Sequence, residues 1–198
     1  NDADSQVFLG YDPPFLVTDA SIAGLAARER PNILLVVLES TRFDHTSLAE
    51  ARLWRGTETP NLAALARRGT TAAHAYVVLP HTTKSLVSIL CARYPAMQEP
   101  IIEISANFHI QCLPEILGRA GYATGFFQSS WGTFEERPRL VDKLGYQHFE
   151  AWEDIQGEKL GYLASDDESL TAPVARWLAG LSEGTPFFVT VLTSATHH

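Results

Sequence analysis

Short apolar runs alternate along the chain with segments in which apolar residues recur every three or four positions. Residues 33–38 (ILLVVL) are apolar throughout and rich in β-branched side chains, which predicts a strand buried on both faces of a parallel sheet. Further runs predict strands over residues 71–78, 122–127 and 187–192, the first of these being rich in alanine.

The segments between these strands have helical periodicity. One spans residues 59–69, from a Thr-Pro start to a closing glycine, and a second follows Pro80. A third covers residues 112–120, and a fourth begins with a capping box of Ser165 and Glu168. Their inward-facing residues are Leu62, Leu65 and Ala66; Leu86, Ile89 and Leu90; Leu113, Ile116, Leu117 and Ala120; and Leu170, Val174, Trp177, Leu178 and Leu181.

This alternation predicts an α/β fold: a mostly parallel sheet, wound right-handedly, with helices on both faces. Residues 131–158 are rich in Trp, Gly and charge and are interpreted as an irregular excursion over the sheet. Residues 1–30 are polar and are interpreted as a linker or lead-in segment, with room for a short helix over residues 19–29. The domain is expected over residues 31–198.

Composition narrows the class of protein. The 198 residues are 45% hydrophobic, enough to bury a core. A net charge of -8 and a pI near 5.3 argue against a nucleic-acid partner, because nucleic-acid-binding modules are usually basic. No apolar run approaches the roughly 18 residues of a membrane span, and the polar start does not resemble a signal peptide. Because the chain begins with Asn rather than Met, we expect that a preceding segment has been removed or left out.

The two cysteines, Cys91 and Cys112, allow two interpretations. They are either buried apolar thiols or the partners of one disulfide, since no metal-binding spacing accompanies them. Pro95 and Pro100 make it easy for the intervening segment to loop back. We expect the disulfide, and with it an oxidising compartment.

Polar residues follow every predicted strand. Ligands of open α/β sheets bind beyond the carboxyl ends of the strands. The residues that directly follow the strands, here called the strand exits, supply a carboxylate, hydroxyls, an amine and imidazoles. These groups suit the binding and cleavage of phosphate or sulfate esters. The exits read Glu39-Ser40-Thr41, His81-Thr82-Thr83-Lys84, Gln128-Ser129-Ser130 and Ser194-Ala195-Thr196-His197-His198.

Thr82 and Glu39 are the sharpest candidates among these residues. The start of a helix favours an anion or a developing alkoxide, and a Thr hydroxyl needs a metal or a base to become a nucleophile. Glu39 supplies a hard oxygen ligand for such a metal. The alternatives are a plain N-cap for Thr82, bonds to backbone amides for Glu39, and a solvated tail for His197 and His198.

Three stretches in this order resemble the sulfatase branch of the alkaline phosphatase superfamily: PNILLVVLES, TPNLAALARRG and a hydroxyl-bearing helix that ends in CARYP. The resemblance runs from Arg30 to the C-terminus. Sulfatases carry two adjacent Asp after the first strand and a C/S-x-P-S-R motif, where this chain has Glu39-Ser40 and residues 82–86 (TTKSL). A single Glu with a Thr nucleophile resembles instead the lipoteichoic acid synthase, phosphoglycerol transferase and phosphoethanolamine transferase types.

The resemblance implies a role for each site residue. Counting back from the CAR of CARYP, Thr82 rather than Thr83 is the nucleophile, and it binds one or two divalent metal ions (Mn, Mg, Zn or Ca) together with Glu39. A phospho-threonine intermediate would carry a phospholipid headgroup, phosphoglycerol or phosphoethanolamine. His197 matches the His of a T-H-x-P element that contacts the phosphate or the leaving group. Three further residues are expected to bind substrate: Arg137, Gln128 in place of a family His, and Lys84, which is equally interpretable as an exposed helix lysine.

The family's remaining Asp-His metal ligands have no counterpart here, so the resemblance implies the N-terminal part of a catalytic domain, incomplete at its C-terminus. We expect the 198 residues alone to be inactive. Transmembrane helices ahead of the domain would anchor it in the membrane, on the extracytoplasmic side. Two alternatives remain: a sulfatase with an atypical nucleophile, and a truncated domain that binds without catalysing.

Overall fold

The computed structural model describes residues 30–49, 59–72, 74–97, 102–104 and 110–197. Its centre is a parallel sheet with strand order β1-β6-β2-β3. Val37 pairs with Leu192 across β1 and β6, and Phe126 pairs with Thr190 across β2 and β6. The strands are β1 (Ile33–Leu38), β2 (Ala123–Gln128), β3 (His148–Glu150) and β6 (Phe187–Thr193). This sheet confirms the α/β fold class.

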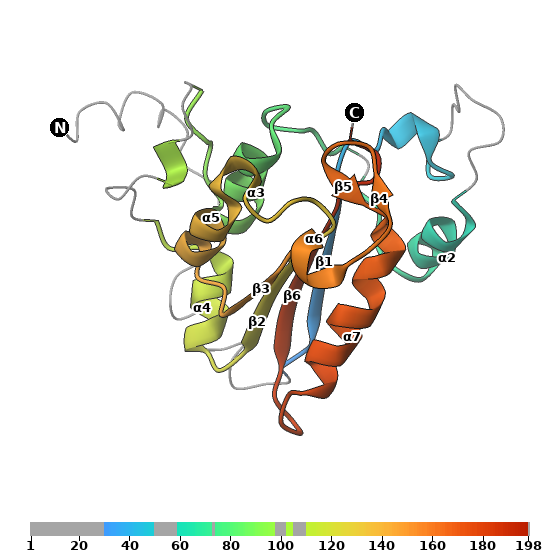
Figure 1. Cartoon of the computed structure of the whole chain (residues 1–198). Coiled ribbons are helices and arrows are strands. Elements are labelled where there is room, and N and C mark those ends of the chain that lie inside the picture. The colour runs from blue at the N-terminus through green and yellow to red at the C-terminus, as the bar shows by residue number, and fades with distance from the viewer. Residues whose placement is uncertain (1–29, 50–58, 73, 98–101, 105–109, 198) are drawn as a thin grey trace. The chain divides into compact units, whose positions relative to one another are not determined.

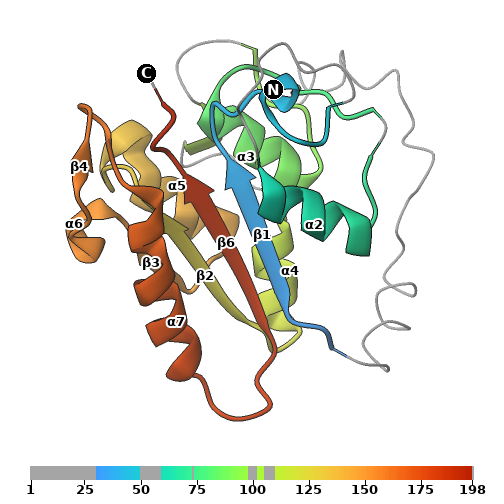
Figure 2. The same ribbon diagram turned by 90° about the vertical axis from the view of Figure 1, so that its right-hand side faces the viewer.

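Helices cover both faces of the sheet, as the alternation predicted (Figures 1 and 2). On one face lie α3 (Thr82–Cys91), α4 (Leu113–Arg119) and α5 (Arg137–Leu144), and on the other lies α7 (Thr171–Ala179). The remaining elements are α2 (Pro60–Arg68), α6 (Trp152–Ile155), the hairpin strands β4 (Lys159–Leu160) and β5 (Ala164–Ser165), and four 3-10 turns: η1 (Phe43–His45), η2 (Ile102–Ile104), η3 (Phe134–Glu136) and η4 (Asp167–Leu170).

Each face of the sheet has its own apolar core. The larger core joins α3, α4 and α5 to the sheet through buried Leu86, Leu90, Leu140, Phe126 and Phe188. The smaller core joins α7 to Phe127, Leu170 and Val189, with Val174, Trp177 and Leu178 packed against them. Burial of these side chains fixes the helices over the strands and so brings the strand exits together at one edge.

The expectation that residues 33–38 are buried on both faces is wrong for the described structure. Exposure alternates along β1, and Leu34, Val36 and Leu38 are 59%, 47% and 44% exposed. The cause is position, because β1 ends the sheet and pairs only with β6 among the described strands. Its other face, with Ile33, Leu35 and Val37, packs on the larger core.

The strand predicted over residues 71–78 is absent from the described part of that range, residues 71–72 and 74–78. Its described residues are irregular, and Tyr76 and Val77 are 84% and 75% exposed. Alanine-rich sequence offers little apolar surface to a sheet, so the alternation there was too weak to specify a strand.

The interpretation of residues 131–158 as an irregular excursion is also wrong. The segment contains α5, β3 and α6, and β3 extends the sheet beside β2. Leu140, Val141 and Leu144 bury one face of α5. Gly145 ends this helix with φ of +89°, and a Cβ there would lie 2.6 Å from Cβ of Glu115. Only glycine fits this close approach of α5 to α4.

The helix near residue 165 begins differently from the prediction. Asp166, not Ser165, is the cap, since its carboxylate accepts a hydrogen bond from Ser169 N at 2.9 Å. A 3-10 turn, η4, precedes the α-helix. The hydroxyl of Ser165 instead donates to the carbonyl of Ser129 at 3.2 Å.

The predicted disulfide is present. Cys91 at the end of α3 is bonded to Cys112, the residue before α4, across a sequence separation of 21. Closing a loop of this size restricts the unfolded chain and stabilises the fold by about 3 kcal/mol. The bond fixes α3, whose other end carries Thr82 and Thr83.

The short helix considered over residues 19–29 lies outside the described residues. Among the helices that the structure does describe, none is long and apolar enough to cross a membrane.

Candidate active site

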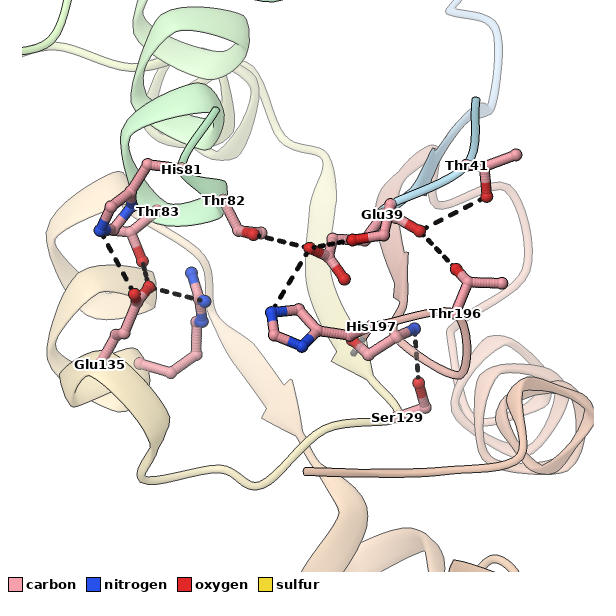
Figure 3. A network of polar contacts seen from close by, with 12 residues as sticks. Glu39, Thr41, His81, Thr82, Thr83, Ser129, Glu135, Thr196 and His197 are labelled. Carbon is pink, nitrogen blue, oxygen red and sulfur yellow. Dashed lines mark hydrogen bonds and ion pairs between the residues drawn. The ribbon is translucent and has the colours of Figure 1, made fainter. Parts of the chain in front are cut away.

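The exits of β1 and β6 meet the first turn of α3 at the carboxyl edge of the sheet. Figure 3 shows the Glu39 carboxylate between Thr82 and His197. Glu39 follows β1 directly, Thr82 is the first residue of α3, and His197 follows β6 after a short turn. Residues far apart in the sequence therefore share one small region.

Glu39 is the centre of this group. Its Oε1 accepts hydrogen bonds from Thr82 Oγ1 at 3.1 Å and from Ser40 Oγ at 3.0 Å, and lies 3.8 Å from His197 Nε2. Its Oε2 is buried with no hydrogen-bond partner among the described residues. A buried carboxylate oxygen normally has a partner, and a hard cation is one that suits it.

The start of α3 is prepared for an anion. His81 precedes the helix in an extended conformation and provides no side-chain cap, so the first backbone N–H groups have no partner from that side chain. Thr82 Oγ1 lies at this positive end of the helix and within reach of Glu39. The hydroxyl therefore sits where both a cation and an anionic group would be stabilised.

A second carboxylate, which sequence analysis missed, lies beside the first. Glu135 accepts a hydrogen bond from Thr83 Oγ1, lies 3.3 Å from His81 Nε2 and 3.6 Å from Arg137 Nη2 (Figure 3). Glu135 and Glu136 have φ of 52° and 50°, a left-handed conformation that costs non-glycine residues energy. The two adjacent acids before Arg137 were the available signal, but residues 131–158 were interpreted as irregular.

Arg137 is the buried cation of the site. It is 1% exposed, and its Nε and Nη1 have no hydrogen-bond partner within the described part of the chain. Burial lowers the pKa of its guanidinium to about 10, while the carboxylates of Glu135 and Glu39 act in the opposite direction. The side chain stays charged at neutral pH. Two unused donors on a buried guanidinium suit a phosphate or sulfate oxygen.

His197 approaches the same carboxylate oxygen of Glu39 that accepts the hydrogen bond from Thr82. Its ring lies edge-to-face with Phe134 and Tyr162, with both centroid distances 6.4 Å. These contacts direct Nε2 toward Glu39 and leave Nδ1 buried without a hydrogen-bond partner among the described groups.

Gln128 is buried at the end of β2, and its amide group serves the following loop. Its Nε2 donates to the carbonyl of Trp131 at 2.9 Å, and Oε1 has no hydrogen-bond partner in the described structure. Among the described residues, the hydrogen bonds of Gln128 Nε2 go to the backbone of Ser130 and Trp131 rather than to Glu39, Thr82 or Arg137. Substrate binding by Gln128 therefore remains a sequence-based expectation.

Lys84 is buried, which excludes the alternative of an exposed helix lysine. It is 1% exposed, and its Nζ donates to the carbonyl of Ala96 at 2.5 Å and lies 3.7 Å from Glu103 Oε2. The side chain of Glu103 is also fully buried. These contacts give Lys84 a structural role, because the ion pair holds α3 against the segment around Ala96.

We expect Lys84→Met to lower the free energy of unfolding by about 3–5 kcal/mol, because it leaves the Glu103 carboxylate buried without its cation. Urea denaturation of the protein measures this. The matched control is Arg119→Met, which removes an exposed cation paired with Glu115 and should cost less than about 1 kcal/mol. Unchanged stability with impaired turnover would instead support substrate binding by Lys84.

The residues present fit part of a metal site. Glu39 Oε2 and Thr82 Oγ1 are hard oxygen donors of the kind that Mg, Mn and Ca prefer, and Zn also accepts. Within the described ranges there is no group of three or more His, Cys, Asp or Glu side chains that could hold a metal. Glu39 and Thr82 are thus candidates for some of the ligands only.

Comparison with known proteins identifies the family of the chain and solved structures with a similar fold. The sulfatase family model matches residues 31–198. No curated protein sequence matches the chain. Among solved structures, the lipoteichoic acid synthase LtaP from Listeria monocytogenes has a TM-score of 0.71 at 18% identity, over 87% of this chain and 42% of that one.

Two other solved structures are similar. A protein in the alkaline phosphatase superfamily from Vibrio parahaemolyticus has a TM-score of 0.72 at 20% identity, over 86% of this chain and 41% of that one. The C-terminal periplasmic domain of EcEptC from Escherichia coli, in complex with Zn, has a TM-score of 0.62 at 18% identity, over 87% and 45%. The chain thus spans less than half the length of these neighbours, and the likeness shows a shared fold.

Proposed function

The chain belongs to the sulfatase family, and on that premise we propose that the whole protein is a metal-dependent transferase or hydrolase of phosphate esters. The substrate we propose is a phospholipid, whose phosphoglycerol or phosphoethanolamine headgroup passes through a phospho-threonine intermediate on Thr82. One observation carries this proposal: Thr82 Oγ1 lies 3.1 Å from Glu39 Oε1, while Glu39 Oε2 is buried without a hydrogen-bond partner among the described residues.

Thr82 acts as the nucleophile in this proposal. Glu39 and Thr82 would hold a divalent metal, which lowers the pKa of a bound hydroxyl and neutralises charge on a phosphoryl group when it is present. Thr82 Oγ loses its proton to solvent and forms a bond to phosphorus, while the bond from phosphorus to the lipid alcohol oxygen breaks and that oxygen takes up a proton. Water or an acceptor alcohol then attacks the phosphorus, and Thr82 leaves.

Arg137 and His197 serve the phosphate and the leaving group. The unpartnered Nε and Nη1 of Arg137 donate to phosphate oxygens, which stabilises the charge that these oxygens carry in the transition state. His197 Nε2, which lies near the same Glu39 oxygen as Thr82, contacts the phosphate or donates a proton to the departing alcohol oxygen.

The neighbours support the class of substrate and the setting. LtaP is a lipoteichoic acid synthase, and the EcEptC domain is periplasmic and was crystallised with Zn. Carried over to this chain, they favour a phosphate ester as substrate, Zn among the candidate metals and an extracytoplasmic location. The Cys91–Cys112 disulfide is also typical of an oxidising compartment. Anchoring in the membrane by helices ahead of the domain is part of the same proposal.

Turnover of two aryl esters by the whole protein tests this function. With added Mn or Zn, we expect hydrolysis of bis-(p-nitrophenyl) phosphate at least about a hundredfold faster than hydrolysis of p-nitrophenyl sulfate, because the site lacks the sulfatase nucleophile motif. Chelation by EDTA should remove the activity, and added metal should restore it. Faster turnover of the sulfate ester would favour the sulfatase alternative. Absence of turnover of both esters would favour a binding domain.

A further inference from the structure

We propose that Asp167 is a positioning residue that holds the turn after β6, residues 194–197, so that His197 faces Glu39. The inference rests on the role that the proposed function gives to His197. Asp167 is the first residue of η4, far from the site in sequence, and no sequence motif pointed to it.

The carboxylate of Asp167 accepts hydrogen bonds from residues that follow two different strands, β2 and β6. Asp167 Oδ1 accepts hydrogen bonds from Ser129 Oγ at 2.6 Å, Ser194 N at 2.9 Å and Ala195 N at 3.2 Å. Asp167 Oδ2 lies 3.4 Å from the same Ala195 N. Ser194 N also reaches Ser129 Oγ at 2.9 Å, so the end of β2, the end of β6 and η4 are tied at one point.

The carboxylate is not occupied in capping its own helix. The neighbouring Asp166 does that, through bonds from Ser169 N at 2.9 Å and from Ser169 Oγ. Asp167 is directed to the strand exits instead. None of the ion pairs between described residues includes Asp167, so backbone amides and a hydroxyl are the groups shown to balance its charge. A carboxylate that accepts several backbone N–H bonds forms strong, directional contacts.

The other contacts of the turn make His197 dependent on this anchor. His197 N donates to Ser194 O at 3.0 Å, which closes the turn, and Thr196 Oγ1 donates to the carbonyl of Glu39 at 2.6 Å (Figure 3). The turn is therefore held at Asp167 on one side and at β1 on the other. His197 Nε2 lies 3.8 Å from Glu39 Oε1 as a result.

Loss of the anchor should affect the rate more than substrate binding. A displacement of about 1 Å in a group that acts in the transition state can cost about a hundredfold in rate. Arg137, which would bind the phosphate, belongs to α5, and its described ion pair is with Glu135 rather than with the turn.

A double-mutant cycle in the whole protein separates positioning from general support of the fold. With bis-(p-nitrophenyl) phosphate, Asp167→Ala should lower kcat about ten- to a hundredfold and change KM less than about threefold. Asp167→Asn, which keeps an acceptor oxygen, should recover part of the loss. In a His197→Ala background, either change should cause little further loss. Equal losses in both backgrounds would overturn the proposal.

The matched control is Asp166→Asn, which alters the adjacent carboxylate and the cap of η4. It should lower stability without energetic coupling to His197→Ala. If Asp167→Ala fails to fold, Asp167→Asn carries the cycle alone, and its loss must then shrink in the His197→Ala background.

Amide hydrogen exchange tests whether Asp167 holds the turn, and it does not depend on catalytic turnover. In Asp167→Asn, exchange at Ser194 and Ala195 should rise at least about tenfold, while the amides of β2 remain protected. Unchanged exchange would overturn the proposal. If the wild-type protein turns over no phosphate ester, the proposed function fails, yet the exchange result still decides whether Asp167 holds the turn.

Discussion

Thr82→Ala in the whole protein is expected to lower turnover of a phosphodiester by at least about a thousandfold, because it removes the proposed nucleophile. The hydroxyl is bonded to Glu39 at the start of α3, and no other described hydroxyl has both features. Thr82→Ser keeps a hydroxyl there and should retain measurable turnover. Steady-state rates with bis-(p-nitrophenyl) phosphate measure both changes.

Thr83→Val is the matched control for this change. Thr83 is the next residue of the same helix, but its hydroxyl donates to Glu135 rather than to Glu39. Valine keeps the buried shape, so we expect a loss of less than about tenfold from the missing hydrogen bond. Mass spectrometry of the quenched enzyme should find a phosphorylated peptide that includes Thr82 and that disappears in Thr82→Ala. A large loss in Thr83→Val with activity kept in Thr82→Ala would reverse the assignment.

Arg137→Gln is expected to weaken binding of phosphate about ten- to a hundredfold. The physical reason is that hydrogen bonds to a charged partner contribute about 1.5–3 kcal/mol, and Nε and Nη1 of Arg137 are buried without partners in the described structure. The KM for a phosphodiester and the dissociation constant of inorganic phosphate measure the change. Arg139→Gln is the control, since Arg139 lies on the same helix but is exposed and paired with Glu136.

The lowered pKa of Arg137 determines how this residue makes the stability of the fold depend on pH. Burial lowers the pKa in the folded state to about 10, below its value in the unfolded chain. Both states are therefore protonated below about pH 10, and the cost of burying the charge is fully present there. Stability from this group rises only as pH passes about 10, where the folded state loses the proton first.

An anion beside Arg137 offsets that cost at working pH. Inorganic phosphate should therefore raise the Tm of the wild-type protein at pH 7–8, and the increase should vary little with pH in that range, as far as Arg137 determines it. The increase should be lost in Arg137→Gln and kept in Arg139→Gln. A phosphate-induced increase that survives in Arg137→Gln would show that the anion binds elsewhere.

The sequence pattern was sufficient to predict those site residues that directly follow a strand or begin a helix. Glu39 and His197 follow parallel strands, and the carboxyl ends of such strands share one edge, so their proximity could be predicted. Thr82 could be placed because a Pro-containing turn precedes a clear apolar helix pattern. Their catalytic roles remain proposals, supported by this proximity.

The sequence pattern did not predict the features of the site that depend on contacts between residues far apart in the sequence. The sequence allowed Lys84 to be a substrate-binding or an exposed helix lysine, but its burial beside Glu103, which belongs to a separate turn, η2, could not be predicted. Asp167 and Ser129 are 38 positions apart in sequence, and nothing local links them. Glu135 lies in a segment whose charge concealed α5 and β3, because short charged helices have weak apolar periodicity.

The left-handed backbone at Glu135 and Glu136 has a consequence for the evolution and engineering of this protein. Glycine would adopt φ near +50° without steric cost, so both positions appear open to stabilising substitution when only the backbone is considered. Glycine at position 135 would, however, remove the carboxylate that contacts Arg137, His81 and Thr83. The backbone gain at position 135 would therefore be opposed by the larger cost of leaving the buried Arg137 without this carboxylate. Of the two positions, only 136, whose carboxylate contacts the exposed Arg139, is open to a stabilising glycine.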